Sequence, residues 1–152
     1  MRRRRSLILS ILILAACSKS EMPATDSPAT AAPAEEAPLT GAAIGGTWEA
    51  EGMPMNQDTV VVRFTMNNTD TGEGTSMVFP SGEKVISTSR QIAGDSMVSE
   101  SGAFKSQVRT GQQVTSTRMV LRLKDGRLTG IATSRYANGD TASFRITATK
   151  KP

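Results

Sequence analysis

Apolar and polar residues alternate strictly along the C-terminal part of the chain, and this alternation restricts the fold more than any other feature. The clearest apolar series are Val60-Val62-Phe64-Met66, Met119-Leu121-Leu123 and Ala142-Phe144-Ile146-Ala148. Neighbouring side chains point to opposite faces of a β-strand, so a period of two predicts strands that bury one face. No segment carries a convincing helical stripe. The chain is therefore predicted to be all-β.

Turn-forming residues divide the alternating region into strands. Asp125-Gly126 and Asn138-Gly139 are hairpin signals, because both central residues of a type I′ turn need a positive φ. With further turn signals they delimit eight strands, expected near residues 46–52, 59–66, 73–79, 84–92, 96–104, 113–124, 127–135 and 140–149. Eight consecutive antiparallel strands close naturally into an up-and-down barrel, which removes exposed edges. We expect this barrel domain to occupy residues 46–152.

Residues 17–45 differ sharply in composition from the barrel region. Prolines recur every five residues among Ala, Thr, Ser and Glu, at Pro23, Pro28, Pro33 and Pro38. Such a composition, with almost no apolar periodicity, predicts a disordered and partly extended linker. As a flexible coil it would span roughly 30 Å on average, so we interpret it as a tether.

The first sixteen residues have the order of a secretory signal. Four arginines, Arg2 to Arg5, precede an apolar run from Leu7 to Ala16 that only Ser10 interrupts. A membrane-spanning helix needs roughly 20 apolar residues, so a spanning helix is the weaker alternative. Residues 1–16 are therefore expected to form a signal peptide that is removed.

The signal ends in Leu14-Ala15-Ala16-Cys17. This segment resembles the lipobox of bacterial lipoproteins. The resemblance implies cleavage between Ala16 and Cys17, a diacylglycerol thioether on the Cys17 sulfur and acylation of the new amino terminus. Two hydrophobic anchors suffice for stable membrane attachment. An ordinary signal with a chance cysteine is the alternative.

The residue after the cysteine bears on location. Ser18 stands where an aspartate would resemble an inner-membrane retention signal. By that resemblance we expect a lipid-anchored protein of the cell envelope, on the outer membrane and facing the periplasm.

The basic charge of the chain belongs to the signal. The chain has 18 basic and 14 acidic residues, a formal charge of +4. Residues 1–16 hold four of the arginines and no acid, so the side chains of the remaining chain sum to zero. The expected partner is therefore a membrane, reached through lipid on Cys17, and no nucleic acid is expected.

The residue types offer little for catalysis or metal binding. There is no histidine, and the one cysteine is expected to carry lipid. Neither a histidine base nor a zinc-type set of ligands is available. We expect no enzyme and no cofactor. Met53 and Met55 are weak candidates for Cu(I), which suits soft thioether ligands, and flexible core filling is the favoured alternative.

Gly46-Thr47-Trp48 opens the first predicted strand. It resembles the G-x-W motif at the start of calycins, the lipocalin-like barrels. In that family a basic residue on the last strand packs across the tryptophan, and Lys150 and Lys151 are the candidates here. The second lipocalin motif, T-D-x-x-Y, is absent. The barrel pattern and the tether together favour a carrier of small apolar molecules.

A basic stripe runs along one predicted hairpin, made of Arg118, Arg122, Lys124 and Arg127. Such a stripe would suit lipopolysaccharide, anionic lipid or an acidic partner. A solvated strand face is the alternative.

Together these features favour a membrane-anchored envelope lipoprotein whose barrel binds a small molecule or has a structural role. A lipid-anchored inhibitor of a protease or lysozyme is the alternative. Families of lipid-anchored eight-stranded barrels that block such enzymes have a similar size and architecture. In addition, Ser101-Gly102-Ala103-Phe104 resembles the serine-glycine loop that lysozyme inhibitors insert into the enzyme cleft. Methionine-based copper binding or sensing is the third hypothesis.

Overall fold

The computed structural model describes residues 38–71 and 74–152. The predicted signal peptide, the cleavage and lipidation site at Ala16 and Cys17, and the tether up to residue 37 lie outside the described residues. Within the described ranges, no helix has both the length and the hydropathy needed to cross a membrane.

The described chain consists of one short helix followed by nine strands. They are α1 (Gly41–Ile44), β1 (Gly46–Pro54), β2 (Val62–Asn68), β3 (Thr75–Val78), β4 (Lys84–Ala93), β5 (Ser96–Ser101), β6 (Phe104–Lys105), β7 (Gln113–Lys124), β8 (Arg127–Tyr136) and β9 (Thr141–Lys150). The two-residue β6 apart, these are the eight strands that alternation predicted, with ends shifted by a few residues. The all-β prediction is confirmed.

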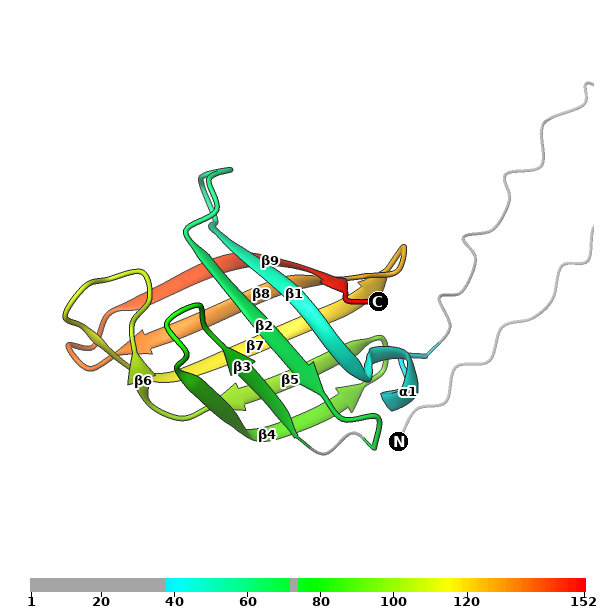
Figure 1. Cartoon of the computed structure of the whole chain (residues 1–152). Helices are drawn as coiled ribbons and strands as arrows, with labels where there is room; N and C mark the ends of the chain where they lie inside the picture. The colour runs from blue at the N-terminus through cyan, green and yellow to red at the C-terminus, as the bar shows by residue number, and fades with distance from the viewer. Residues whose placement is uncertain (1–37, 72–73) are drawn as a thin grey trace, which may run out of the picture. The chain divides into compact units, whose positions relative to one another are not determined.

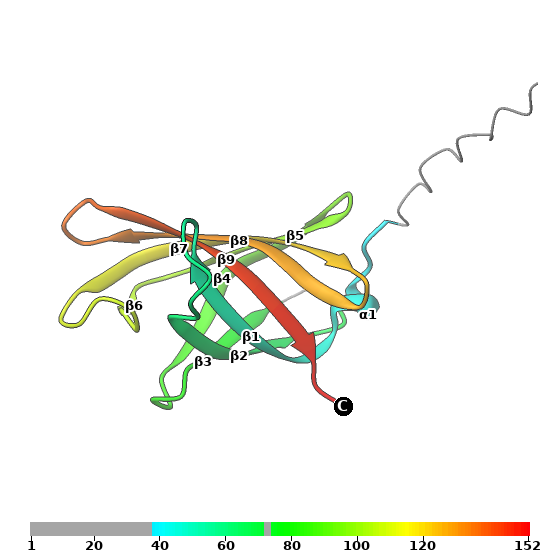
Figure 2. The same ribbon diagram turned by 90° about the horizontal axis from the view of Figure 1, so that it is seen from above.

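The strands form a closed antiparallel barrel, as predicted (Figures 1 and 2). Strands β1 to β5 pair in chain order, and β9 returns to pair with β1. The ring closes where β5 pairs with β7, from Ser96↔Arg122 to Ser101↔Thr117. Strand β6 pairs with β7 just beyond, through Phe104↔Val114. Both edges of β7 are therefore occupied.

Helix α1 fills one end of the barrel with apolar side chains. Ile44 and Trp48 are almost fully buried, and Leu39 belongs to the same core. The Ile44 carbonyl accepts hydrogen bonds from Trp48 Nε1 at 2.9 Å and from Asn68 Nδ2 at 3.0 Å. Thr75 Oγ1 in turn donates to Asn68 Oδ1 at 2.9 Å. The side chains of Trp48, Asn68 and Thr75 thus share one hydrogen-bonded network, as buried polar groups require.

The packing of α1 changes the extent of the barrel unit. Residues 38–45 were assigned to the tether because Leu39 and Ile44 stand isolated among Pro, Gly and Ala. In the structure these two side chains are buried in the barrel core. A single helical turn with one buried side chain has no periodicity for a sequence pattern to reveal.

A lysine covers the tryptophan as the calycin resemblance implies. Lys150 Nζ lies 5.5 Å from the centroid of the Trp48 ring, within range of a cation–π contact. Lys151, the other candidate, instead lies 3.5 Å from Glu49 in an exposed ion pair. The barrel is compatible with a calycin-like fold, and Lys150 has the expected position.

The two predicted glycine turns differ. At Asp125-Gly126 both residues have positive φ, 51° and 72°, as a type I′ turn requires. At Asn138-Gly139 only Gly139 does, so the type I′ prediction is wrong there. The Asn138 side chain accepts a hydrogen bond from the Asp140 amide at 3.1 Å, which forms an Asx-type turn in a longer loop.

Strand β4 separates from β3 after residue 86, and an inward-facing arginine, Arg90, spans the gap between the two strands. The ladder between them runs only over residues 84–86 of β4, and the β4–β5 register shifts between Ser87 and Ser89. This shift is a bulge in β4. After the bulge, Arg90 Nη1 donates hydrogen bonds to the backbone carbonyls of Thr69 at 2.8 Å and Gly74 at 3.1 Å. A bulge and an inward charge both discourage pairing at an open strand edge.

We predict that Gly130→Ala destabilises the barrel. A Cβ at Gly130 on β8 would overlap the carbonyl oxygen of Val120 on β7, so one strand must shift. Overpacking of this kind costs about 1–3 kcal/mol of unfolding free energy, measured by urea denaturation. Gly102→Ala is the matched control, since its nearest neighbour is a Thr88 methyl group at 3.8 Å. Equal stability of the two variants would contradict the prediction.

Candidate functional site

The end of the barrel opposite α1, here called the mouth, contains an apolar cavity. Figures 1 and 2 both place α1 at one end and β6 at the other. The cavity has a volume of about 50 Å³, and aliphatic side chains and four phenylalanines line it, Phe64, Phe79, Phe104 and Phe144. Ring centroids lie 5.9 Å apart for Phe64–Phe79 and 5.6 Å apart for Phe79–Phe104. The rings thus form a continuous apolar wall.

Two hydroxyl groups stand among the mainly apolar side chains that β7 and β8 contribute to the cavity. They belong to Thr117 and Ser134, and their oxygens are 2.8 Å apart in a hydrogen bond. Ser106 and Gln107 add polar groups from the loop above. Among the described residues, none that lines the cavity is charged. The cavity is therefore mainly apolar, with a few neutral polar groups in its lining.

A loop of residues 106–112, here called the roof loop, covers the cavity. Val108 lines the cavity while remaining partly exposed. The Ser106 hydroxyl accepts hydrogen bonds from the amides of Val108 at 3.2 Å and Arg109 at 2.8 Å. The Ser106 amide donates to the Gln112 carbonyl at 2.9 Å, which closes the loop upon itself. The roof loop is thus a compact unit that connects β6 to β7.

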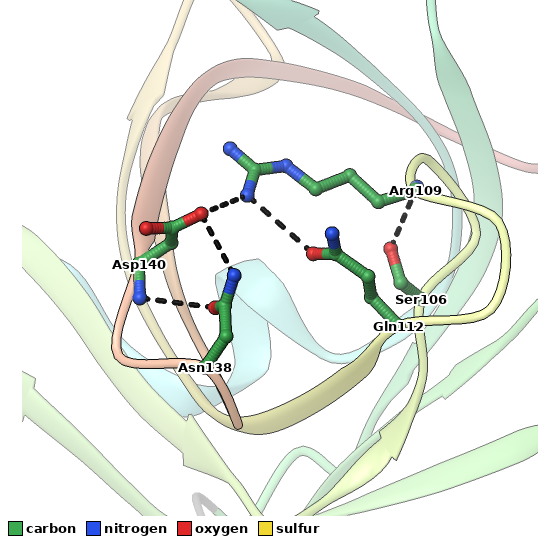
Figure 3. Close-up of polar contacts among 5 residues, drawn as sticks. All are labelled: Ser106, Arg109, Gln112, Asn138 and Asp140. Carbon is green, nitrogen blue, oxygen red and sulfur yellow. Dashed lines mark hydrogen bonds and ion pairs between the residues drawn. The ribbon is translucent and has the colours of Figure 1, made fainter.

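Arg109 fastens the roof loop to the turn between β8 and β9 (Figure 3). Its Nη1 lies 2.9 Å from Asp140 Oδ2, and its guanidinium lies 4.3 Å from the centroid of the Tyr136 ring. Asn138 Nδ2 donates to the same carboxylate oxygen at 3.0 Å. Hydrogen bonds from Asn138 and Arg109 lower the pKa of Asp140 from its ordinary value. We call this arrangement the Arg109 latch.

A second set of contacts fastens the other side of the roof loop. Gln107 Nε2 donates to Glu83 Oε2 at 3.0 Å, and the Lys105 amide donates to Glu83 Oε1 at 3.2 Å. Glu83 belongs to the turn between β3 and β4. The roof loop is therefore held to two turns of the mouth mainly by polar side chains.

The size of the cavity limits what it can hold with the roof loop in place. Ligand pockets usually have volumes of about 300–1,000 Å³, and an engineered cavity that binds benzene has about 150 Å³. At about 50 Å³ the present cavity is smaller than both. An occupant larger than a few atoms therefore requires the roof loop to move outward.

The four residues of the predicted basic stripe lie along the β7–β8 hairpin, but two of them form ion pairs with acidic side chains. Arg122 Nε lies 2.9 Å from Asp95, and Arg118 Nε lies 3.8 Å from Glu100, all on exposed side chains. Lys124 and Arg127 face each other beside the β7–β8 turn. In the part of the chain that the structure describes, neither of these two has a carboxylate within ion-pair distance. Within the stripe, the unpaired positive charge therefore lies at the α1 end of the hairpin.

The copper candidates lie apart from the other described methionines. Met66, Met77, Met97 and Met119 are buried in the core, as the core-filling alternative expects. Met53 is paired across the ladder with Arg145, and Met55 is exposed in the turn after β1. Met53 and Met55 therefore have no core thioether to complete a shared site with them. Among the described residues, no cluster of His, Cys, Asp or Glu suits a metal either.

The segment that suggested an inhibitor lies in the barrel wall. Ser101 ends β5 and is 3% exposed, and Phe104 pairs with β7 and packs against the core. Ser101 and Phe104 therefore do not form a projecting loop, and inserting them into an enzyme cleft would break the closure of the barrel. This segment therefore does not support the inhibitor hypothesis, which then depends on the size and architecture of the barrel alone.

Sequence reasoning did not find the Arg109 latch. Arg109 and Asp140 are separated by 31 residues, and only the closed barrel brings their turns together. The one local signal was the polar composition of residues 105–113 between two strands, which marks a long connection but not its position over the mouth.

The comparisons with known proteins do not extend these observations. The chain matches no protein-family model and no curated protein. Its function must therefore be inferred from the site.

We predict that acid releases the roof loop. The pKa of Asp140 in the folded protein lies below its ordinary value of 3.8. A carboxylate with a lowered pKa stabilises the fold above its unfolded pKa, about 3.9, and loses that effect as pH falls through the folded value. NMR chemical shifts of the Arg109 and Gln112 amides should thus stay constant from pH 7 to about pH 4 and change below it.

The control for the acid prediction is Asp140→Asn. It should show the released chemical shifts already at pH 7, and the acid-dependent change at these two amides should disappear. If the variant titrates like the original chain, Asp140 does not control the loop.

Proposed function

We propose that this chain is a lipid-anchored protein of the bacterial envelope whose barrel binds a small apolar molecule at its mouth. The anchor is the lipid expected on Cys17, and the membrane is the outer one. The described barrel begins at its plugged end, with Leu39 and α1, so a tether would join the barrel at the end opposite the mouth.

The observation that carries the proposal is the contrast between the two ends of the barrel. Apolar packing fills the α1 end, where Ile44 and Trp48 are almost fully buried. The mouth instead has a cavity beneath a loop held by partly exposed polar contacts, such as Arg109–Asp140. Ion pairs that water reaches contribute little stability, so such a roof can open at low cost. A removable roof over an apolar cavity suits ligand entry.

The same cavity favours binding over catalysis. Its polar groups include the hydroxyls of Ser106, Thr117 and Ser134 and the amide of Gln107. A hydroxyl becomes a nucleophile only beside a base that takes its proton. The chain has no histidine, and no described lysine or carboxylate lines the cavity. We therefore propose a binding protein that is not an enzyme.

Replacement of Cys17 tests the anchor. Cys17→Ala should abolish the incorporation of labelled palmitate and release the protein from membranes, because the lipid would be bonded to the cysteine sulfur. Fractionation of the host cells and autoradiography measure both effects, with Ser18→Ala as the control that keeps both. Undiminished palmitate labelling of Cys17→Ala would overturn this part of the proposal.

Binding of a fluorescent apolar probe tests the pocket. The described barrel lies within residues 38–152. The binding test therefore uses a chain that begins at Ser18 and carries no lipid. N-phenyl-1-naphthylamine should bind it and gain fluorescence. Arg109→Ala should bind the probe more tightly, because loss of the latch lowers the population of the closed roof loop, which blocks the cavity. Ala132→Val should bind it more weakly, since Ala132 lines the cavity and valine fills space there.

The control for the cavity variant is Thr133→Val, one residue along β8. Thr133 is exposed and hydrogen-bonds Ser143 on the outer surface, so probe affinity should not change. Absence of probe binding to both the original chain and Arg109→Ala would refute a ligand pocket at the mouth.

A further inference from the structure

Four hydroxyl side chains stand in one row across the inner wall of the barrel. The strand registers pair Ser87 with Ser101, Ser101 with Thr117 and Thr117 with Ser134. Residues paired directly across a ladder share a face, and their Cβ atoms lie about 5 Å apart. Thr117 and Ser134 line the cavity, so the whole row faces inward. We call these residues the hydroxyl row.

Three of the four residues in the hydroxyl row are buried, and one of their hydroxyls is unsatisfied. Ser101, Thr117 and Ser134 are 3%, 6% and 7% exposed, whereas Ser87 is half-buried. Thr117 and Ser134 hydrogen-bond each other at 2.8 Å. The Ser101 Oγ has no hydrogen-bond partner among the described residues. A buried hydroxyl without a partner destabilises the fold, so an unused one is uncommon in a folded core.

Core packing alone does not explain these residue types. Alanine would have nearly the shape of serine, and valine that of threonine, without any hydroxyl to satisfy. Toward the α1 end, the next inward pairs of β5 and β7 are Ser99 with Met119 and Met97 with Leu121, all buried. The hydroxyl row differs from them because two of its members, Thr117 and Ser134, line the cavity.

The cavity walls also restrict the charge of an occupant. No described lysine, arginine, aspartate or glutamate lines the cavity. Burial of an ion without a partner is far more costly than burial of a hydroxyl or carbonyl that forms a hydrogen bond. A carboxylate or an ammonium group would thus be rejected, whereas a neutral oxygen-bearing group would find both donors and acceptors in the row.

We propose that the pocket selects an uncharged amphipathic molecule with an apolar body and one hydroxyl or carbonyl group. The body lies against the phenylalanine rings, and the oxygen exchanges a hydrogen bond with the Thr117–Ser134 pair, which lines the cavity. Ser101 lies outside the lining but is paired with Thr117, and its free hydroxyl joins this hydrogen bond. This inference rests on the proposed binding function and adds the chemical class of the ligand.

Three small aromatic probes of similar size test the selection. Phenol carries a neutral hydroxyl, toluene carries none, and benzoate is charged. Each is titrated into the chain from Ser18 onward, and affinity is read from NMR shifts of methyl groups around the cavity. Phenol and toluene should bind, and benzoate should bind at least tenfold more weakly than phenol.

Variants of the row separate selection from packing. Ser101→Ala should lower the affinity for phenol relative to toluene by about threefold to tenfold, the worth of one hydrogen bond. Ser134→Ala should shift the same ratio in the same direction. Thr133→Val, which removes an outward hydroxyl from the same strand, should leave the ratio unchanged. Urea denaturation should show that Ser101→Ala is no less stable than the original chain, since it removes an unpartnered group.

The outcomes distinguish the two proposals. If the ratio of phenol affinity to toluene affinity is the same in the original chain and in Ser101→Ala, the pocket is supported but the proposed selection is wrong. The selection is also wrong if benzoate binds as tightly as phenol. If none of the three probes binds, both the selection and the binding function fail, and Ser101 then hydrogen-bonds only to water.

Discussion

Pairing between β5 and β7 is the interaction on which the rest of the structure depends. It joins the two halves of the sheet, and it leaves both edges of β7 occupied along most of its length. It also determines what lies above the mouth. Because β5 and β7 are adjacent and antiparallel, the segment between them must turn at the mouth. Here that segment is longer than a tight hairpin, and its surplus forms β6 and the roof loop. The roof is thus a consequence of how the barrel closes.

The two ends of the barrel are stabilised by different forces. At the α1 end, Ile44 and Trp48 are buried, and one backbone carbonyl is shared by two side-chain donors. At the mouth, the roof loop is held by Arg109–Asp140 and Gln107–Glu83, which water and salt weaken. Local opening follows the segments with the fewest buried apolar contacts. The mouth is therefore the end at which we expect this barrel to open without unfolding.

Alternation and turn residues were sufficient to predict the barrel, because a period of two and a glycine turn are local signals. The hydroxyl row could not be predicted from the sequence, because its members are far apart in the chain. Ser87, Ser101, Thr117 and Ser134 are unremarkable in sequence, and only the strand registers align them. A bulge between Ser87 and Ser89 takes part in that alignment, and bulges leave no distinct pattern here. Likewise α1 is too short for a helical pattern, although Ile44 is completely buried.

Buried polar atoms without hydrogen-bond partners are informative when they lie near other unusual features. In a foldable sequence local choices agree with the fold, and exceptions tend to mark functional sites. Arg90 is one exception, with two nitrogens lacking partners, yet its third nitrogen binds two carbonyls across the gap between β3 and β4. Its role in the wall is therefore evident. The unpartnered hydroxyl of Ser101 bridges no such gap. It is paired with Thr117, which lines a cavity whose roof is held by weak contacts. For this reason we propose that a molecule entering the mouth, and not the barrel itself, supplies the missing hydrogen-bond partner.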